Sequence, residues 1–424
     1  MNKKQPNPKV SLRDKEILRK LAGRMREIAD LPEQKKRQQR LYDLNGLKPD
    51  RPIILCFPEG AWVELVPESV IECADPLLRL WEISLRQKIY WWEKIRDDHT
   101  LEPYFNLSWD FDRGDMGVVA PKTQGADRGS FVWDPPLKDL ENDMAKLHFR
   151  RPTVDREKTK NRVALADSIF GDLLTVRVRG YLAYWWSMGL TGTAIELIGL
   201  ENLMLYMYDK PAALHRLMAW LRDEHINYIE WIEKEGLITQ NNRDDYTGSG
   251  GVAYTHELPQ ADWKPGRPVR LKDVWGFSES QETVGISPAM FSEFIFPYQL
   301  PILEKFGLNC YGCCEGVHER LDYILKIPRL RRISVSPWAN QEILAQRLGK
   351  KYVFSRKPNP SQICVSFDEK AIRDDLRTTL AIAGHGVLEI IMKDTHTVEH
   401  KPERITRWVE IALEEVERFM EKKK

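Results

Sequence analysis

The clearest indication of the fold class is the stretch Gly307-Leu-Asn-Cys-Tyr-Gly-Cys-Cys-Glu-Gly-Val-His318. Its first half, Leu-Asn-Cys-Tyr, has the length and apolar content of a buried strand, and its second half is a polar loop. A helical pattern precedes it from Pro288 to Phe306, and another follows from Val317 to Lys326. A strand between two helices that ends in a polar loop is the repeating unit of parallel α/β folds. In α/β barrels the chemistry lies at the carboxyl ends of such strands, so we expect it in this loop.

The same order of strand, loop and helix recurs at least five times after Gly171. The other expected strands are Ile53 to Phe57, Leu173 to Arg179, Val269 to Trp275, Leu330 to Val335, Lys351 to Phe354 and Val387 to Ile391. This repetition predicts an α/β protein with a (β/α)8 TIM barrel over residues 51–424 and an N-terminal helical extension over residues 1–50. A doubly wound open sheet is the alternative, but no GxGxxG motif follows the first strand.

The composition narrows the class of protein. The chain has 424 residues, 42% of them hydrophobic, which is ample for a large core. Its 64 basic and 63 acidic residues nearly cancel, so charge gives no case for nucleic acid or an anionic membrane. No signal peptide and no uncharged apolar run of roughly 20 residues is found. Six cysteines in so long a chain are not a disulfide framework. We therefore expect a reduced, cytoplasmic protein.

Polar and aromatic residues follow the expected strands, and a barrel would bring them to one mouth. They are Glu59, Glu279, Glu282, Cys313, Cys314, Glu315, Trp338, Lys357, Asn359, Asp394 and His396. This set contains ligand types for zinc from three strands, and a catalytic zinc needs three or four of them. The alternative for the cysteines is that they are small hydrophobic residues of the core, which suits Cys310 inside its strand.

The segment from Leu101 to Pro135 is long, irregular and rich in glycine, aspartate and aromatic residues. Such an excursion is typical of a functional loop or lid. It carries Trp109, which together with Glu59 and Trp62 is expected to line a substrate pocket. No Gly-x-Ser-x-Gly elbow, P-loop or His-Glu-x-x-His motif is present, so the corresponding hydrolase, NTPase and zincin classes lose support.

Several segments resemble one known family. They are Trp275-Gly-Phe-Ser-Glu-Ser-Gln281, Ile286 to Tyr298, Cys310 to Glu315 and Lys357-Pro-Asn-Pro360. Their sequence and order resemble the uroporphyrinogen decarboxylase superfamily over most of the chain beyond residue 50. Within it the chain looks most like the corrinoid-dependent methyltransferases that demethylate aryl methyl ethers. The resemblance implies a (β/α)8 barrel, a zinc ion and a partner protein that carries a corrinoid.

The sequence departs from the pattern of the coenzyme M methyltransferases of that superfamily. They use a His-x-Cys pair and a later cysteine, whereas here Tyr311 replaces the histidine and no cysteine lies near Asp394. Oxygen or nitrogen ligands would have to replace them, which gives a harder site suited to an ether oxygen. The roles this implies are zinc ligation by Cys313, Glu279, Asp394 and His396, catalysis by Glu279, Glu315, Lys357 and Asn359, and corrinoid contact by Trp338 and Tyr311.

The resulting hypothesis is a zinc-dependent methyltransferase that moves a methyl group from a methoxylated aromatic compound to a Co(I) corrinoid. Other methyl donors or acceptors, such as a thiol, tetrahydrofolate or a methylamine, stay open. A decarboxylase is a second reading, although a tetrapyrrole carboxylate site should be rich in arginine. A non-catalytic barrel that binds a corrinoid protein or a small ligand is a third.

Overall fold

The computed structural model describes residues 10–125, 130–179 and 188–422. The chain divides into two compact units, each assembled from separate pieces: unit 1 comprises Met1–Leu107, Lys158–Val178 and Arg356–Lys424, and unit 2 comprises Ser108–Glu157 and Arg179–Ser355. The N-terminal helices therefore belong to unit 1 together with the first strand and the last helix. The predicted domain boundary at residue 50 stays a prediction.

A six-stranded sheet contains most of the predicted strands. Its order is β1-β14-β13-β12-β11-β10, with bounds β1 (Ile53–Cys56), β10 (Trp275–Ser278), β11 (Leu308–Tyr311), β12 (Leu330–Val335), β13 (Val353–Arg356) and β14 (Val387–Met392). The pairings β1–β14, β10–β11 and β11–β12 are parallel. Every residue of β1, β10, β11 and β14 is buried. Continuous burial is typical of parallel strands covered on both faces.

Unit 1 holds a second parallel pair, β2 (Tyr104–Leu107) with β7 (Thr175–Val178). Its helices are α1 (Leu12–Ala29), α2 (Pro32–Asn45), α3 (Trp62–Leu65), α4 (Pro76–Tyr90), α6 (Arg156–Phe170), α14 (Ser361–Cys364), α15 (Glu369–Ala383) and α16 (Glu403–Glu421). Ser11 caps α1, because its side-chain oxygen accepts a hydrogen bond from Asp14 N at 3.0 Å. Leu18 and Met25 of α1 belong to the same core cluster as Trp81, and their spacing places them on one apolar face of the helix.

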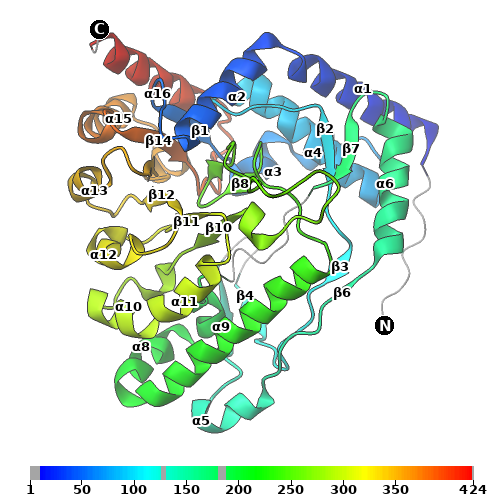
Figure 1. The fold of residues 1–424 in the computed structure, drawn as a ribbon. Helices are drawn as coiled ribbons and strands as arrows, with labels where there is room; N and C mark the ends of the chain where they lie inside the picture. Colours follow the sequence, from blue (N-terminus) through cyan, green and yellow to red (C-terminus); the bar gives the residue numbers. More distant parts are fainter. Residues whose placement is uncertain (1–9, 126–129, 180–187, 423–424) are drawn as a thin grey trace. The chain divides into compact units, whose positions relative to one another are not determined.

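Unit 2 contains β10 to β12 and the helices that follow them along one side of these strands (Figure 1). The helices that follow these strands are α10 (Pro288–Phe294), α11 (Phe296–Leu303), α12 (Leu321–Ile324) and α13 (Gln341–Leu348). The described part of unit 2 also has α5 (Leu140–Asp143), α7 (Thr191–Ile198), α8 (Leu200–Asp209) and α9 (Pro211–Lys234), which precede β10 in the chain. Three short antiparallel pairs complete it, β3 (Phe111–Asp112) with β6 (Thr153–Val154), β4 (Lys122–Gln124) with β5 (Phe131–Trp133), and β8 (Tyr246–Thr247) with β9 (Gly251–Val252).

Three sequence predictions of secondary structure are corrected. The segment from Leu101 to Pro135 is not wholly irregular, because β2 to β5 lie in its described part. The expected strand Val269 to Trp275 starts only at Trp275, since residues 271–273 form a 3-10 turn that Asp273 and Arg270 close. The expected helix Pro288 to Phe306 is interrupted at Ile295, where Pro297 lacks the amide hydrogen that a continuous helix needs.

The predicted α/β class with parallel strands is confirmed, while closure into a barrel stays a prediction. Among the described residues the parallel strands form two separate sheets, one of six strands and one of two. Within the same described part, no helix is long and apolar enough to span a membrane.

Candidate active site

The loops after β10 and β11 meet in unit 2, as the strand pattern predicted. The strands are in parallel register with Ser278 opposite Tyr311, so both loops leave the sheet at the same edge. Glu315 joins them: its Oε1 accepts a hydrogen bond from Ser280 N at 2.9 Å, and its Oε2 accepts one from Cys313 N at 2.8 Å. The Glu315 carboxyl group is therefore a fixed bridge between the two loops.

Glu279, the first residue after β10, is the most perturbed acid of this site. It is 4% exposed, and its Oε2 accepts a hydrogen bond from Gln281 N at 2.8 Å. Burial raises the pKa of Glu279 well above its usual range, and the charges of Glu282 and Glu315 raise it further. Burial and the neighbouring acids therefore favour the protonated form of this carboxyl group.

Glu315 lies in a different electrostatic environment, although it is equally buried. Burial raises the pKa of Glu315, but the backbone N–H groups of Cys313 and Ser280 and the charge of Arg320 oppose the rise. The same three groups stabilise a carboxylate. When two neighbouring acids compete for protons, the one with hydrogen-bond donors around it keeps the negative charge. We assign the proton to Glu279 and the charge to Glu315.

A chain of hydrogen bonds fixes the backbone around these acids. Arg320 Nη1 donates to Ser280 Oγ at 2.9 Å, and the Tyr311 hydroxyl lies 3.2 Å from the same oxygen. The Tyr311 hydroxyl also donates to Gln299 Oε1 at 2.8 Å, and Gln299 Nε2 donates to the carbonyl of Glu279 at 2.8 Å. Tyr311 is 1% exposed. Its hydroxyl supports the site here, and its predicted contact with a corrinoid stays a prediction.

The cysteines of the loop differ in exposure. Cys310 is part of the buried core, as its place inside the strand predicted. Cys313 is 5% exposed and accepts a hydrogen bond from Ser249 Oγ at 3.4 Å. Cys314 is exposed. It lines a pocket of about 310 Å³ in unit 2 together with Glu315, His318, Trp338, Val284 and other residues of the loop. Trp338 is 72% exposed, so its ring is accessible, as its predicted corrinoid contact requires.

The four predicted zinc ligands are divided between the units. Glu279 and Cys313 lie in unit 2, and the thiol of Cys313 contributes to the raised pKa of Glu279. Asp394 and His396 lie in unit 1. Within the described ranges, no group of three or more His, Cys, Asp or Glu side chains is arranged to hold a metal ion. A catalytic zinc needs at least three protein ligands, so the zinc and its ligand set stay predictions.

In unit 1, residues that follow β1 and β14 are also in contact with one another. Asp394, which follows β14, donates its backbone N–H to Glu59 Oε2 at 2.9 Å. Lys393, 5% exposed, donates to Asp394 Oδ1 at 2.6 Å and lies 3.9 Å from Glu59. Burial raises the pKa of Glu59 while Lys393 opposes the rise. Glu59 and Asp394 have positive φ angles of 48° and 58°, a strained conformation that is common at functional sites.

An Asp–His pair beside these residues was not recognised in the sequence. His99 Nδ1 lies 2.7 Å from Asp97 Oδ2, and the His99 ring lies 4.1 Å from that of Trp91. Trp62, predicted to line a substrate pocket, lies 5.7 Å from Trp91. Burial alone would raise the pKa of Asp97, but the charge and hydrogen bonds of His99 outweigh it and lower the pKa. The π-helical turn Trp91–Ile95 could have signalled this cluster, since such turns occur often at functional sites.

The other predicted site residues occupy structural positions. Asn359 Oδ1 accepts a hydrogen bond from Ser361 N at 3.0 Å, which closes a turn. Lys357 is 3% exposed directly after β13, and the ring of Trp109 lies 5.6 Å from the Arg156 guanidinium. His396 packs against Gly60, where an added Cβ would lie 3.1 Å from the His396 Cα. Their proposed roles in catalysis, substrate binding and metal binding stay predictions.

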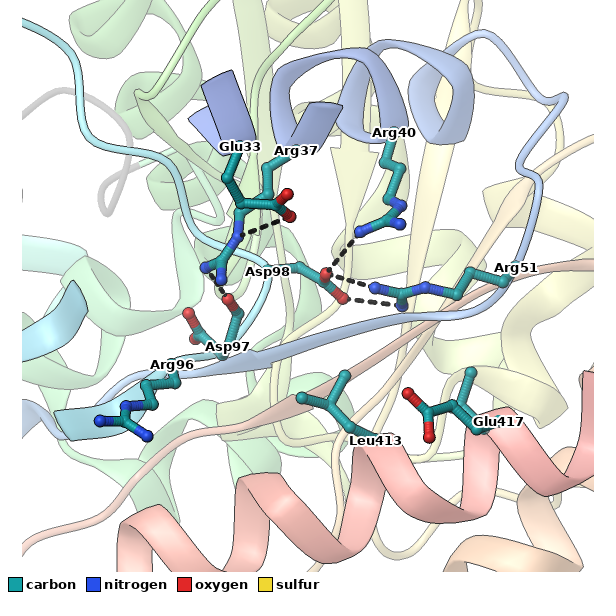
Figure 2. Close-up of a pocket in the computed structure, with 10 residues that line it drawn as sticks. Glu33, Arg37, Arg40, Arg51, Arg96, Asp97, Asp98, Leu413 and Glu417 are labelled. Atoms are coloured by element: carbon teal, nitrogen blue, oxygen red, sulfur yellow. Dashed lines mark hydrogen bonds and ion pairs between the residues drawn. The ribbon is translucent and has the colours of Figure 1, made fainter. Parts of the chain in front are cut away.

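A second pocket, of about 220 Å³, lies in unit 1 beside the start of β1 (Figure 2). Arg51 forms a 2.6 Å ion pair with Asp98, and Arg40 lies 3.9 Å from the same carboxylate. Asp98 also accepts a hydrogen bond from Ile54 N at 2.9 Å. Asp98 is therefore paired with arginine side chains of this pocket and holds the N-terminal part of β1. We assign the pocket a structural role.

Comparisons with known proteins find a solved structure with a similar fold, but they do not place the chain in a family. No family model and no curated protein matches the sequence. The fold is similar to that of a methyltransferase from Methanosarcina mazei. The similarity covers 91% of this chain and 99% of that chain, with a TM-score of 0.50 and 12% sequence identity. At this identity the likeness concerns the fold alone.

Proposed function

We propose that the chain is a methyltransferase that moves a methyl group from a methoxylated aromatic compound to the Co(I) corrinoid of a partner protein. The observation that carries the proposal is the pair of buried carboxyl groups of Glu279 and Glu315 at the ends of β10 and β11, where burial favours the protonated form of Glu279. The sequence resemblance described above supports the reaction class, and the fold that the chain shares with a methyltransferase is compatible with it.

Glu279 supplies the proton that ether cleavage requires. As the bond between the methyl carbon and the ether oxygen breaks, its electron pair stays on the oxygen, which takes the proton of Glu279. The acceptor provides the electron pair of the new bond to the methyl carbon, and solvent returns a proton to Glu279 before the next turnover. General acid catalysis of this kind is worth about 10²–10⁴-fold in rate. No step here uses zinc.

The pocket beside Glu315 has room for the aromatic donor. Its volume of about 310 Å³ lies at the lower end of the range for small-molecule sites. The exposed ring of Trp338 offers a stacking surface, and Val284 adds an apolar contact. Glu315 lines the same pocket, so a donor bound there lies beside one of the two acids, the one that follows β11.

Anaerobic methyl transfer to free Co(I) cobalamin tests the proposal. A panel of methoxylated benzoates and phenols is mixed with the purified full-length chain, and the methylated cobalamin is followed by its absorbance while the phenol is measured by chromatography. We expect both products in equal amounts. Glu279→Gln should reduce the rate by about 10²–10⁴-fold. Glu230→Gln, which removes an exposed carboxylate paired with Lys305, serves as the matched control.

Carbon dioxide release from an aromatic or tetrapyrrole acid, without methyl transfer from any donor, would overturn the proposal in favour of a decarboxylase. A protonated Glu279 suits that reaction too, because the carbanion left by decarboxylation needs a proton. Equal rates for Glu279→Gln and the parent chain would refute the role given to Glu279.

A further inference from the structure

Two adjacent thiols in unit 2 lie within reach of each other. The sulfur atoms of Cys313 and Cys314 are 3.6 Å apart. Cys314 is exposed and opens into the pocket of about 310 Å³, whereas Cys313 is buried behind it. An accessible thiol backed by a second, buried thiol is the arrangement of a nucleophile and its resolving partner in thiol–disulfide exchange.

We propose that Cys313 and Cys314 are a reversible modification site that a low-molecular-weight disulfide such as oxidised glutathione converts to a vicinal disulfide. Cys314, as the thiolate, attacks one sulfur of the small disulfide, which releases one thiol and leaves a mixed disulfide on Cys314. Cys313 then attacks the Cys314 sulfur and releases the second thiol. The two protein thiols are oxidised, the small disulfide is reduced to two thiols, and two protons pass to solvent or the leaving thiolates.

Exposure gives Cys314 the role of the attacking thiol, because small molecules reach it and not the buried Cys313. Charges of both signs lie around it. Arg320 lines the same pocket, and a positive charge near a cysteine stabilises its thiolate. Glu315 and Glu319 also line it and act in the opposite sense. The carboxylate of Glu315 is directed to the N–H groups of Ser280 and Cys313, which offsets part of its charge.

The disulfide between neighbours is strained and therefore easily reduced again. Consecutive Cα atoms are about 3.8 Å apart, whereas disulfides usually join Cα atoms about 4.4–6.8 Å apart. Strained disulfides have more oxidising potentials than structural ones and are the labile, regulatory kind. The modification should thus form under oxidising conditions and be reversed by cellular thiols.

Oxidation would disturb the acid pair through the backbone of Cys313. Cys313 N donates to Glu315 Oε2 at 2.8 Å, and the carbonyl of Cys313 accepts from Ser334 Oγ at 2.9 Å. Closing the ring twists the peptide between the two cysteines, which strains both hydrogen bonds. Gly312 has a φ of +92° and can absorb part of the rotation. This regulatory consequence rests on the proposed function, whereas the modification itself does not.

The test uses the full-length chain, reduced and then exposed to oxidised glutathione without oxygen. Peptide mass spectrometry should show the parent Cys313–Cys314 peptide lighter by two hydrogen atoms and without a glutathione adduct. Cys313→Ser should retain one glutathione on Cys314, because the resolving thiol is missing. Cys314→Ser should show neither product in this loop. Cys364→Ser, which removes a half-buried cysteine of unit 1, should behave as the parent.

A lasting glutathione adduct on Cys314 of the parent chain, or no reaction there at all, overturns the proposal. Blocking Cys314 of the parent with N-ethylmaleimide before oxidation gives the same test without a variant. In the cobalamin assay, oxidation should abolish methyl transfer, and dithiothreitol should restore it. The mass readout does not depend on that activity. Disulfide formation in a chain that transfers no methyl group would uphold the modification and refute the proposed function.

Discussion

Replacing Glu279 with glutamine tests whether this carboxyl group keeps its proton in the folded chain. The amide matches a neutral acid in shape and can still accept the hydrogen bond from Gln281 N. In the parent, the folded-state pKa of Glu279 is raised, while the unfolded chain ionises it near its ordinary value of about 4.3. The contribution of Glu279 to the free energy of unfolding is therefore fully present below its ordinary pKa. It is lost as the pH rises towards the pKa that Glu279 has in the folded chain.

The loss is about 1.4 kcal/mol in the free energy of unfolding for each pH unit between the two pKa values. Glutamine does not ionise, so the variant avoids this loss. We expect parent and variant to be similarly stable at pH 4, and the variant to gain stability relative to the parent as the pH rises above the ordinary pKa of a glutamate. Burial and the charges of Glu282 and Glu315 cause the effect.

Urea unfolding at a series of pH values, followed by tryptophan fluorescence, measures the difference. Glu230→Gln is the control, because that carboxylate is exposed and pairs with Lys305 on the surface. Parallel pH profiles for the parent and Glu279→Gln would show that Glu279 ionises normally in the fold. That result would refute both the protonation assignment and the acid step built on it.

Three further outcomes follow from the same contacts. Gly189→Ala places a Cβ 2.5 Å from Glu279 Oε1, so it should destabilise the chain by about 1–3 kcal/mol in thermal unfolding, and an unchanged melting temperature would contradict the packing described. Arg150→Met leaves the buried carboxylate of Glu224 without its 2.5 Å partner and should cost about 3–5 kcal/mol in urea unfolding; a loss below about 1 kcal/mol would contradict it. The sequence predicts one zinc per chain, reduced in Cys313→Ser, and mass spectrometry of protein purified without chelator that finds no metal would contradict that prediction.

The strands and long helices could be predicted because their pattern is local. The strand Leu330–Val335 has the bounds that the sequence predicted, and the apolar residues of Pro211–Lys234 recur at helical spacing along its buried face. Elements decided by single residues were harder to predict. Pro297 interrupts the helical segment that begins at Pro288, and a short ion-paired turn delays the strand that ends at Ser278.

The site could be predicted only in part, for a related reason. Parallel strands bring their carboxyl ends to one edge, so the neighbourhood of Glu279 and Glu315 follows from chain order once the strands are known. The side chains that hold these two acids in place cannot be predicted from the order of the strands along the chain. Arg320 reaches Ser280 across 40 positions, a contact that depends on how the helix after β11 packs. The Asp97–His99 pair was overlooked because its aromatic surroundings come from separate elements.

The pairing of β1 with β14 has a consequence for synthesis on the ribosome. Glu59 and Asp394, which follow these strands, are hydrogen-bonded across 335 positions. At about 5–20 residues per second, the apolar strand Ile53–Cys56 waits roughly 15–70 s for its partner to be made. An unpaired apolar strand is open to pairing with another chain during that time. We therefore expect slower translation and high expression temperature to increase aggregation, and a chaperone that shields extended apolar segments to improve the yield.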